Sequence, residues 1–182
     1  MLRGGNGAVQ AAGPRPLTFT PIGHSVQDRV TVPDGYEAQV LLRWGDGLFP
    51  GISDMGNDVG GLNQTAALQE RRFGYNCDFV GYFPLPGYNS GNSSHGLLAV
   101  NHEYTNPELM FINYSASEPD PSYVDVEIAA HGLSVVEISR GGAGRWQFSR
   151  SSAFNRRITG ETLIDITGPA AGHPLLRGSY DT

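Results

Sequence analysis

Hydrophobic and polar positions along the chain form short apolar runs that are separated by stretches rich in glycine, proline, asparagine and serine. Short runs with β-branched and aromatic residues, bounded by such turn residues, are typical of β-strands. This pattern predicts strands at 36–44, 79–84, 97–100, 133–140, 145–149 and 162–166. Because a glycine-rich stretch, 141–144, separates two of these runs, 133–140 and 145–149 form the clearest β-hairpin in the sequence.

A first helix signal follows a glycine-rich segment, 45–62, that we expect to be a loop. Either Asn63 or Thr65 can serve as the N-cap of a short helix over 66–72. Gly74 lies beyond the end of this helix, where glycine is favoured. The sequence therefore predicts a short helix before the first aromatic strand.

A second helix signal lies at 120–132. Asp120 is suited to the N-cap position, Pro121 to the first turn and Gly132 to the end, with His131 as the last residue of the helix body. The run 123–128 also has β propensity, so a strand is the alternative there. The cap residues at both ends favour the helix.

Short strands without alternating long helices argue against a parallel sheet and favour an antiparallel, mainly β fold. We expect residues 1–20, which lack periodicity, to be a flexible leader or tether, and residues 21–182 to form one β-rich domain. The turn-rich stretch at 179–182 contains no closing element. If the fold is a propeller, with ~40–50 residues per blade, this chain provides only the first few blades, that is, the N-terminal part of a β-propeller with short helical insertions.

Composition excludes several classes of protein. The chain has 25 glycine and 12 proline residues, a hydrophobic fraction of 39% and a charged fraction of 16%, a combination too apolar and too weakly charged for a disordered chain. No stretch approaches the ~18 consecutive apolar residues of a membrane span. Residues 1–10 contain one arginine and no apolar segment, so we expect no secretory signal in them.

Charge argues against nucleic acid as a specific partner. The net charge is −6, and all 12 basic residues are arginine, which form no dense basic face in the sequence. Cys77 is the single cysteine, which excludes an intrachain disulfide and leaves a structural, metal-ligating or nucleophilic thiol.

The richest group of polar residues lies at the ends of two expected strands. Cys77 and Asp78 begin one of them, and Asn101 and Glu103 follow the next. In a hairpin these ends meet at the same edge of the sheet, and the period of two sends Asn101 and Glu103 to one side and His102 to the other. Sulfur suits iron or zinc and oxygen ligands suit calcium, so the set is a plausible metal site. The alternative is a small buried cysteine beside turn-forming and solvated polar residues.

Other polar residues are weaker candidates. Glu127 and His131 stack on one face if 121–131 is helical, although a capping histidine explains His131 equally well. The acidic loop 54–58 resembles calcium-binding loops in composition but lacks the ligand spacing of an EF-hand. The remaining histidines that we expect to be exposed are His24, His95 and His173.

Six stretches of the sequence, in the same order, resemble the N-terminal part of the PhoX-type alkaline phosphatases. They are DRVTVPDGY (28–36), LRWGD (42–46), FGYNCD (73–78), VNHEYTN (100–106), AHGLSVV (130–136) and TGPAAG (167–172). This resemblance implies a β-propeller phosphomonoesterase with a mixed iron and calcium cluster. It also implies export to the periplasm or the outside of the cell, commonly by the twin-arginine route, and we expect a monomer.

The resemblance carries roles over to individual residues. It implies that Cys77 is the thiolate bound to iron, that Glu103 is a carboxylate ligand, and that Asn101 is a catalytic polar group near the metal or phosphate together with Glu103. Asp78 and Glu127 are further metal ligands with weaker support. Family members are several hundred residues long, and their other ligands and a phosphate-binding arginine lie downstream. We therefore expect this chain to be a fragment that is inactive alone.

Two other functions remain open from the sequence. A non-catalytic β-propeller module that binds carbohydrate or protein would retain calcium for structure only. A nucleophilic Cys77 paired with His95 or His102 is weaker, because no orienting carboxylate motif accompanies either histidine.

Overall fold

The computed structural model describes residues 18–57, 64–87 and 90–176, which fall into two units divided after Gln39. Residues 18–39 of the first unit contain no helix or strand, and their one ring contact is an edge-to-face pair of Phe19 and Tyr36. The second unit contains all the helices and strands described below. Residues 1–17, most of the expected leader, lie outside the described ranges.

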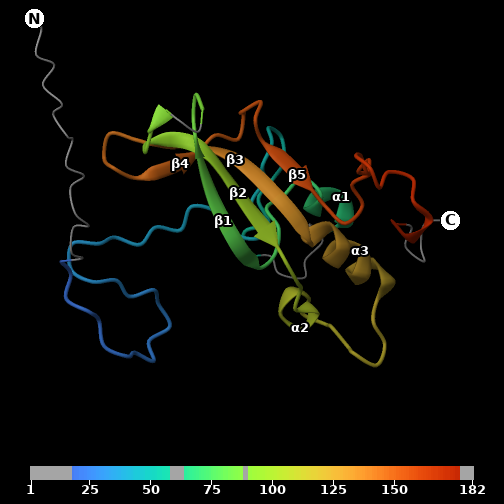
Figure 1. Cartoon of the computed structure of the whole chain (residues 1–182). Coiled ribbons are helices and arrows are strands. Elements are labelled where there is room, and N and C mark those ends of the chain that lie inside the picture. The colour runs from blue at the N-terminus through green and yellow to red at the C-terminus, as the bar shows by residue number, and fades with distance from the viewer. Residues whose placement is uncertain (1–17, 58–63, 88–89, 177–182) are drawn as a thin grey trace, which may run out of the picture. The chain divides into compact units, whose positions relative to one another are not determined.

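The second unit combines one sheet with three short α-helices (Figure 1). Its strands are β1 (Cys77–Pro84), β2 (His95–His102), β3 (Gly132–Arg140), β4 (Trp146–Phe148) and β5 (Arg156–Ile158). Its helices are α1 (Ala66–Gln69), α2 (Pro107–Met110) and α3 (Pro121–Ala130), and a 3-10 helix spans Pro174–Leu176.

All strand pairs of the sheet are antiparallel, in the order β1-β2-β3-β4, and β5 pairs with β3. The short strands β4 and β5 pair with different halves of β3. The mainly β, antiparallel prediction is confirmed. The sheet is open within the described residues, so the propeller stays a prediction.

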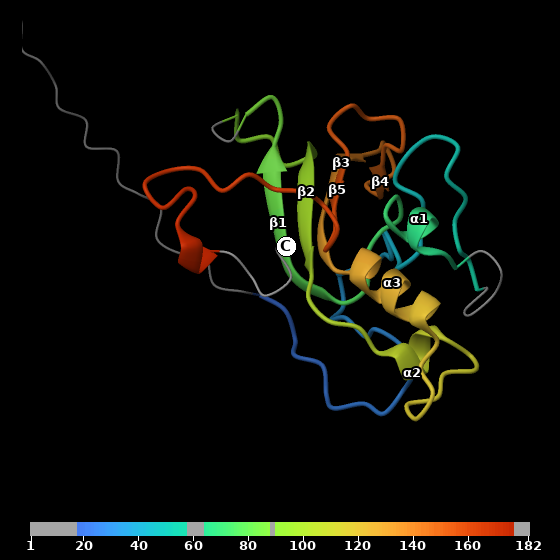
Figure 2. The same ribbon diagram turned by 90° about the vertical axis from the view of Figure 1, so that its right-hand side faces the viewer.

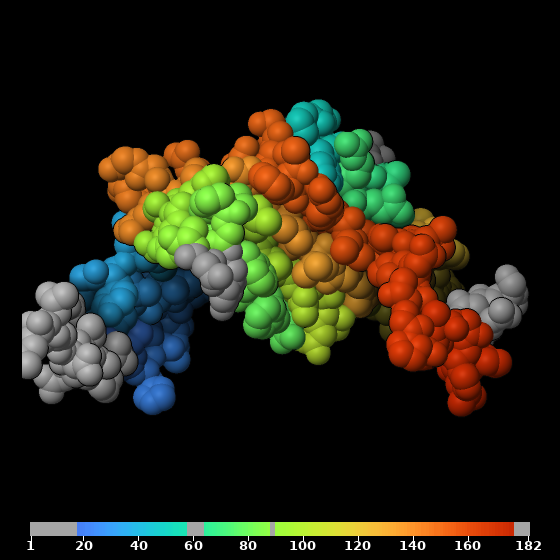
Figure 3. Space-filling model, turned by 45° about the horizontal axis from the view of Figure 1, so that its top comes forward, coloured from blue at the N-terminus to red at the C-terminus, as the bar shows by residue number. Residues whose placement is uncertain are grey.

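Most of the expected strands are present, but two are not. The segment 36–44 has no strand, and it ends in a turn in which the carboxylate of Asp46 accepts from the Arg43 N–H. The segment 162–166 is exposed along its whole length and pairs with no strand of the described residues. The space-filling view shows this part of the chain at the surface (Figure 3). Sequence patterns missed β5, because a strand that begins with two arginines does not look apolar.

Both predicted helices form. Thr65 Oγ1 accepts from the Leu68 N–H and caps α1, which is shorter than expected. Asp120 caps α3 by accepting from the Ser122 N–H, and α3 ends at Ala130 with His131 as its C-cap. Asn63, the alternative cap for α1, lies outside the described residues. The helix α2 was not predicted.

Two clusters of buried side chains hold the second unit together. The first covers one face of the sheet and contains Leu48, Phe73, Val100, Val136 and Ile138. The second joins α2 to α3 and contains Met110, Phe111, Val126 and Ala130. Figure 2 shows α2 and α3 beside the end of the sheet where β1 begins and β2 ends. The helices therefore lie at the edge of the sheet that carries the candidate site.

Candidate functional site

The first residue of β1 and the last residue of β2 lie opposite each other at one edge of the sheet. Cys77 is the register partner of His102, and the Glu103 N–H donates to the Asn76 carbonyl oxygen at 3.4 Å. The predicted hairpin geometry is thus confirmed for the backbone. Glu103 is the donor of this hydrogen bond, and Cys77 directly follows its acceptor, Asn76.

Cys77 is an exposed thiol, which contradicts the alternative of a small buried cysteine. Although the side chain reaches solvent, partial burial raises the pKa of the thiol. The preceding residue, Asn76, has φ of 52°, a left-handed conformation that asparagine tolerates better than most residues. An irregularity in the register between Cys77 and Val80 separates this first residue from the regular part of β1. The local backbone therefore sets Cys77 apart from the rest of its strand.

The residues at the end of β2 alternate in exposure. Asn101 and Glu103 are exposed, whereas His102 is 3% exposed and faces the core. Asp78, at the start of β1, is also exposed. The predicted alternation is confirmed, and it leaves the side-chain oxygens of Asn101 and Glu103 on the solvent side and the imidazole of His102 on the core side.

The imidazole of His102 is held by its own contacts. His102 Nε2 lies 3.3 Å from the Gly74 N and 2.8 Å from Ser134 Oγ. The pKa of His102 is lowered to about 4, mainly by burial and secondarily by the positive charge of Arg157. The ring is therefore neutral at neutral pH and makes no hydrogen bond to Cys77 among the described contacts.

Glu127 reaches the same end of the sheet from α3. Its Oε1 accepts a hydrogen bond of 2.7 Å from Thr105 Oγ1, two residues after Glu103. His131 does not pair with this carboxylate, because its Nδ1 lies 2.6 Å from the Glu127 carbonyl oxygen. The structure thus supports the capping interpretation of His131 and connects Glu127 to the segment after β2.

Arg157 anchors the C-terminal end of α3. Its guanidinium donates to the carbonyl oxygens of Ala129 and His131, and its Nε donates to the Arg72 carbonyl oxygen. Burial lowers the pKa of Arg157 to about 10. Because two of these carbonyl oxygens belong to the C-terminal end of α3, the hydrogen bonds of Arg157 stabilise the part of the helix that carries Glu127.

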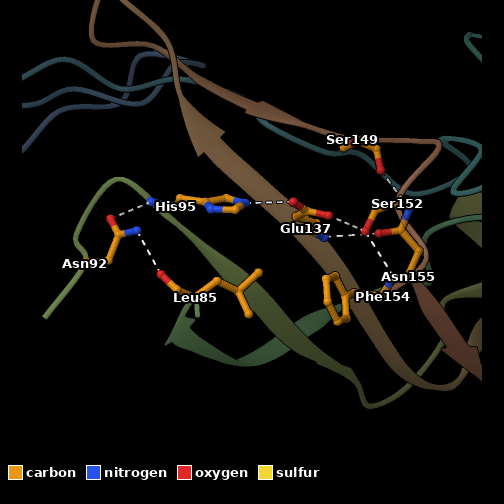
Figure 4. A network of polar contacts seen from close by, with 8 residues as sticks. All are labelled: Leu85, Asn92, His95, Glu137, Ser149, Ser152, Phe154 and Asn155. Atoms are coloured by element: carbon orange, nitrogen blue, oxygen red, sulfur yellow. Dashed lines mark hydrogen bonds and ion pairs between the residues drawn. The ribbon is translucent and has the colours of Figure 1, made fainter. Parts of the chain in front are cut away.

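Two candidates from the sequence lie elsewhere. His95 is half-buried, at the opposite end of β2 from Cys77, and its Nε2 lies 2.7 Å from Glu137 Oε1 (Figure 4). The pairing with Glu137 leaves 42% of the His95 side chain exposed, so the expected exposure holds only in part for His95, whereas His24 and His173 are exposed. Asp54 pairs with Arg150, and Asp58, from the same acidic loop, lies outside the described residues.

The side chains at this edge of the sheet include the types of group that bind metal ions, but too few of them lie close together to form a complete site. A thiol and a carboxylate are ligands for iron, and amide and carboxylate oxygens are ligands for calcium. In the described parts of the chain, however, no three His, Cys, Asp or Glu side chains converge closely enough to hold a metal ion. Cys77 and Glu103 therefore fit as part of a ligand set.

Comparison with known families decides the relationship. The family model described as alkaline phosphatase PhoX matches residues 17–182. The chain belongs to this PhoX family. None of the curated protein sequences matches the chain significantly. The resemblance found in the six sequence stretches is thus confirmed.

A solved PhoX structure has the same backbone arrangement over most of this chain. It is PhoX from Pseudomonas fluorescens in complex with vanadate, a transition state analogue, with a TM-score of 0.76 and 36% sequence identity. The match covers 90% of this chain and 27% of that PhoX chain. This chain therefore corresponds to about a quarter of the solved PhoX protein.

Sequence reasoning did not assign a supporting role at this edge of the sheet to three residues. Thr105 donates a hydrogen bond to the Glu127 carboxylate, and His102 accepts one from the Gly74 N–H. Asn76 provides the left-handed backbone conformation before Cys77. Only Asn76 carries a signal in the sequence, because asparagine tolerates positive φ better than most residues.

None of the helices in the described ranges is long and apolar enough to cross a membrane.

Proposed function

We propose that this chain forms the first part of the catalytic domain of a PhoX-type phosphomonoesterase, which releases inorganic phosphate from organic phosphate esters. The observation that carries the proposal is the sheet edge where the backbone of Asn76 and Cys77 lies beside that of His102 and Glu103, with the Cys77 and Glu103 side chains exposed, in a chain of the PhoX family. The vanadate bound to the related PhoX is a transition state analogue, which supports phosphoryl chemistry for this fold.

In this proposal Cys77 binds iron and Glu103 binds the same cluster, with Asp78 and Glu127 as further ligands and calcium as the second metal. When bound, these cations neutralise the phosphoryl oxygens of the substrate. The chain itself has a net charge of −6, so binding of an anionic substrate requires that bound cations make the electrostatic potential at the site positive.

The protein residues have distinct tasks at this edge. Asn101 is exposed on the same side as Glu103, where its amide can donate to a phosphate oxygen. Thr105 orients one oxygen of Glu127 by hydrogen bonding, which leaves the other oxygen free of that contact. The backbone hydrogen bond between Glu103 and Asn76 fixes the spacing between the two strands that carry the thiol and the carboxylate.

We further propose that the chain is a fragment of an exported enzyme. The chain spans 27% of the solved PhoX protein, and the described residues hold fewer than three clustered ligands. Several large apolar side chains are also exposed, including Phe79 and Phe83 on β1, and Leu163 is 99% exposed. Apolar surface of this extent is typical of an interface with further protein. The remaining ligands and a phosphate-binding arginine would come from that further part.

Hydrolysis of p-nitrophenyl phosphate with iron and calcium supplied tests the proposal. We expect no turnover by the 182-residue chain, and turnover by a longer polypeptide that contains it. The Cys77→Ala variant of the longer protein should lose the thiolate-to-iron absorption band and its activity, whereas Cys77→Ser provides a matched control for size. Turnover by the 182-residue chain would contradict the fragment proposal, and calcium without iron in the longer protein would favour a non-catalytic binding module.

A further inference from the structure

The buried imidazole of His102 lies beneath the segment that leads into Cys77. His102 is the register partner of Cys77 and is only 3% exposed. Its Nε2 faces the backbone N–H of Gly74 at 3.3 Å and the hydroxyl of Ser134, a fully buried residue of β3, at 2.8 Å. One ring nitrogen thus connects the core of the sheet to the residue three positions before the thiol.

The hydrogen bonds of His102 determine which nitrogen carries the proton. A backbone N–H can only donate, so Nε2 of His102 accepts from Gly74 and the proton of the neutral ring lies on Nδ1. His102 Nδ1 is buried and has no hydrogen-bond partner among the described residues. The ring therefore acts towards Gly74 as a fixed acceptor.

Each residue of the segment before Cys77 has its own backbone anchor. His102 accepts from Gly74, the Tyr75 N–H donates to the Ala130 carbonyl oxygen at 3.1 Å, and the Asn76 carbonyl oxygen accepts from the Glu103 N–H. These anchors come from β2, from the end of α3 and from the residue after β2. They hold Asn76 in its left-handed conformation, which costs free energy in the absence of such contacts.

The contact between His102 and Gly74 is also steric. A Cβ atom added to Gly74 would lie 2.4 Å from His102 Cγ and 2.5 Å from the Ala130 carbonyl oxygen. The adjacent Phe73 ring packs edge-to-face on the imidazole with ring centroids 4.7 Å apart. The backbone before Cys77 therefore packs directly against the His102 imidazole.

We propose that His102 is a positioning residue for Cys77, which fixes the Gly74–Asn76 segment from the core side of the sheet and thereby sets the direction of the thiol. The proposal rests on the proposed function in one respect, namely that the positioned thiol binds iron. His102 does not act as a base on the thiol, because neither ring nitrogen hydrogen-bonds Cys77 in the described contacts.

Three variants test this role. His102→Phe keeps a ring for the contact with Phe73 but removes the acceptor for Gly74. His102→Gln keeps an acceptor, since its amide oxygen can reach the position of Nε2. Val136→Ala is the control, because Val136 is fully buried in the same sheet, pairs with Leu98 and lies outside the Gly74–Asn76 segment.

The main readout is the rate at which iodoacetamide alkylates Cys77 in metal-free folded protein, followed by mass spectrometry of the peptide that contains it. This readout serves the 182-residue chain and any longer polypeptide alike. We expect His102→Phe to raise the rate about five- to tenfold, the range for loss of one buried hydrogen bond. His102→Gln should stay within about twofold of the wild type because the acceptor is retained, and Val136→Ala should leave the rate unchanged despite its lower melting temperature.

The second readout is the thiolate-to-iron absorption band of the metal-loaded longer protein. We expect this band to shift or weaken in His102→Phe and to recover in His102→Gln. An unchanged alkylation rate in His102→Phe, or an equal change in Val136→Ala, would overturn the proposal. Absence of the band in the wild type would instead contradict the iron ligand, and the alkylation rates would still decide the role of His102.

Discussion

The hydroxyl of Thr105 donates a hydrogen bond of 2.7 Å to Glu127 Oε1. Thr105 lies two residues after Glu103, and Glu127 lies in the last half of α3. The bond therefore connects the end of β2 to a carboxylate that is separated from it by 22 residues along the chain. Both side chains are partly buried, so the contact is shielded from competition by water.

The first prediction concerns this contact. If Glu127 is a metal ligand, Thr105→Val should lower metal affinity or activity of the longer protein about 10- to 100-fold, because groups that orient a ligand have effects of this size. Thr105→Ser retains the hydroxyl and should stay close to the wild type. Metal content by mass spectrometry and kcat of the loaded protein are the measurements.

The Glu127→Gln variant provides the comparison for Thr105. Wild-type metal content in both Glu127→Gln and Thr105→Val would show that Glu127 is not a ligand. Loss in Glu127→Gln alone would show that the carboxylate binds metal without help from Thr105.

Local patterns predicted the elements whose signals are short-range. The cap residues Thr65 and Asp120 predicted α1 and α3, and the hairpin around 141–144 predicted β3 and β4. The segment 162–166 was misjudged because its apolar residues are exposed rather than paired in the sheet. The strand β5 was missed because the half-buried Arg157 donates to carbonyl oxygens from distant parts of the chain, which its sequence does not reveal.

The candidate site was predictable only in part for the same reason. The hairpin rule placed Cys77 and Glu103 at one edge, which the backbone confirms. Exposure of Cys77, the contact of Thr105 with Glu127 and the contact of His102 with Gly74 depend on tertiary packing. No spacing in the sequence encodes these contacts.

The second prediction tests the close packing at Gly74. Gly74→Ala should lower the free energy of unfolding by about 1–3 kcal/mol, the usual range for overpacking, because the new methyl group would overlap the His102 ring and the Ala130 carbonyl. Gly142→Ala is the control, since nothing lies within 4 Å of a Cβ there and its φ is not positive. Urea unfolding measures both, and equal effects would show that Gly74 is not tightly packed.

The third prediction concerns the half-buried guanidinium of Arg157. Arg157→Met should reduce the free energy of unfolding by about 2–4 kcal/mol, because several buried carbonyl oxygens lose their donor at once. Arg157→Lys should recover little, since one ammonium group cannot reproduce the planar set of donors. Arg156→Met, at the exposed neighbouring position of β5, should change stability by less than about 0.5–1 kcal/mol. A stable Arg157→Met protein would show that water replaces the guanidinium.

The fourth prediction concerns the polar network at the far end of the sheet. Glu137 lies between His95, at 2.7 Å, and Ser152, whose hydroxyl donates to the other carboxylate oxygen (Figure 4). The hydrogen bond from Ser152, followed by that from His95, lowers the pKa of Glu137 below its ordinary 4.5. A carboxyl group with a lower pKa in the folded state binds protons less readily there than in the unfolded chain.

The ionised Glu137 therefore stabilises the fold fully above its unfolded pKa of 4.5, and this contribution is lost as the pH falls through the lower folded pKa. We expect the free energy of unfolding of the wild type to decrease more steeply below about pH 4.5 than that of Glu137→Gln. Urea unfolding at several pH values between about 6 and about 3 measures the two slopes. Glu118→Gln, which removes an exposed carboxylate after α2, should keep the wild-type slope. Equal slopes in all three proteins would mean that Glu137 is protonated alike in both states and that the network stabilises the sheet by neutral hydrogen bonds alone.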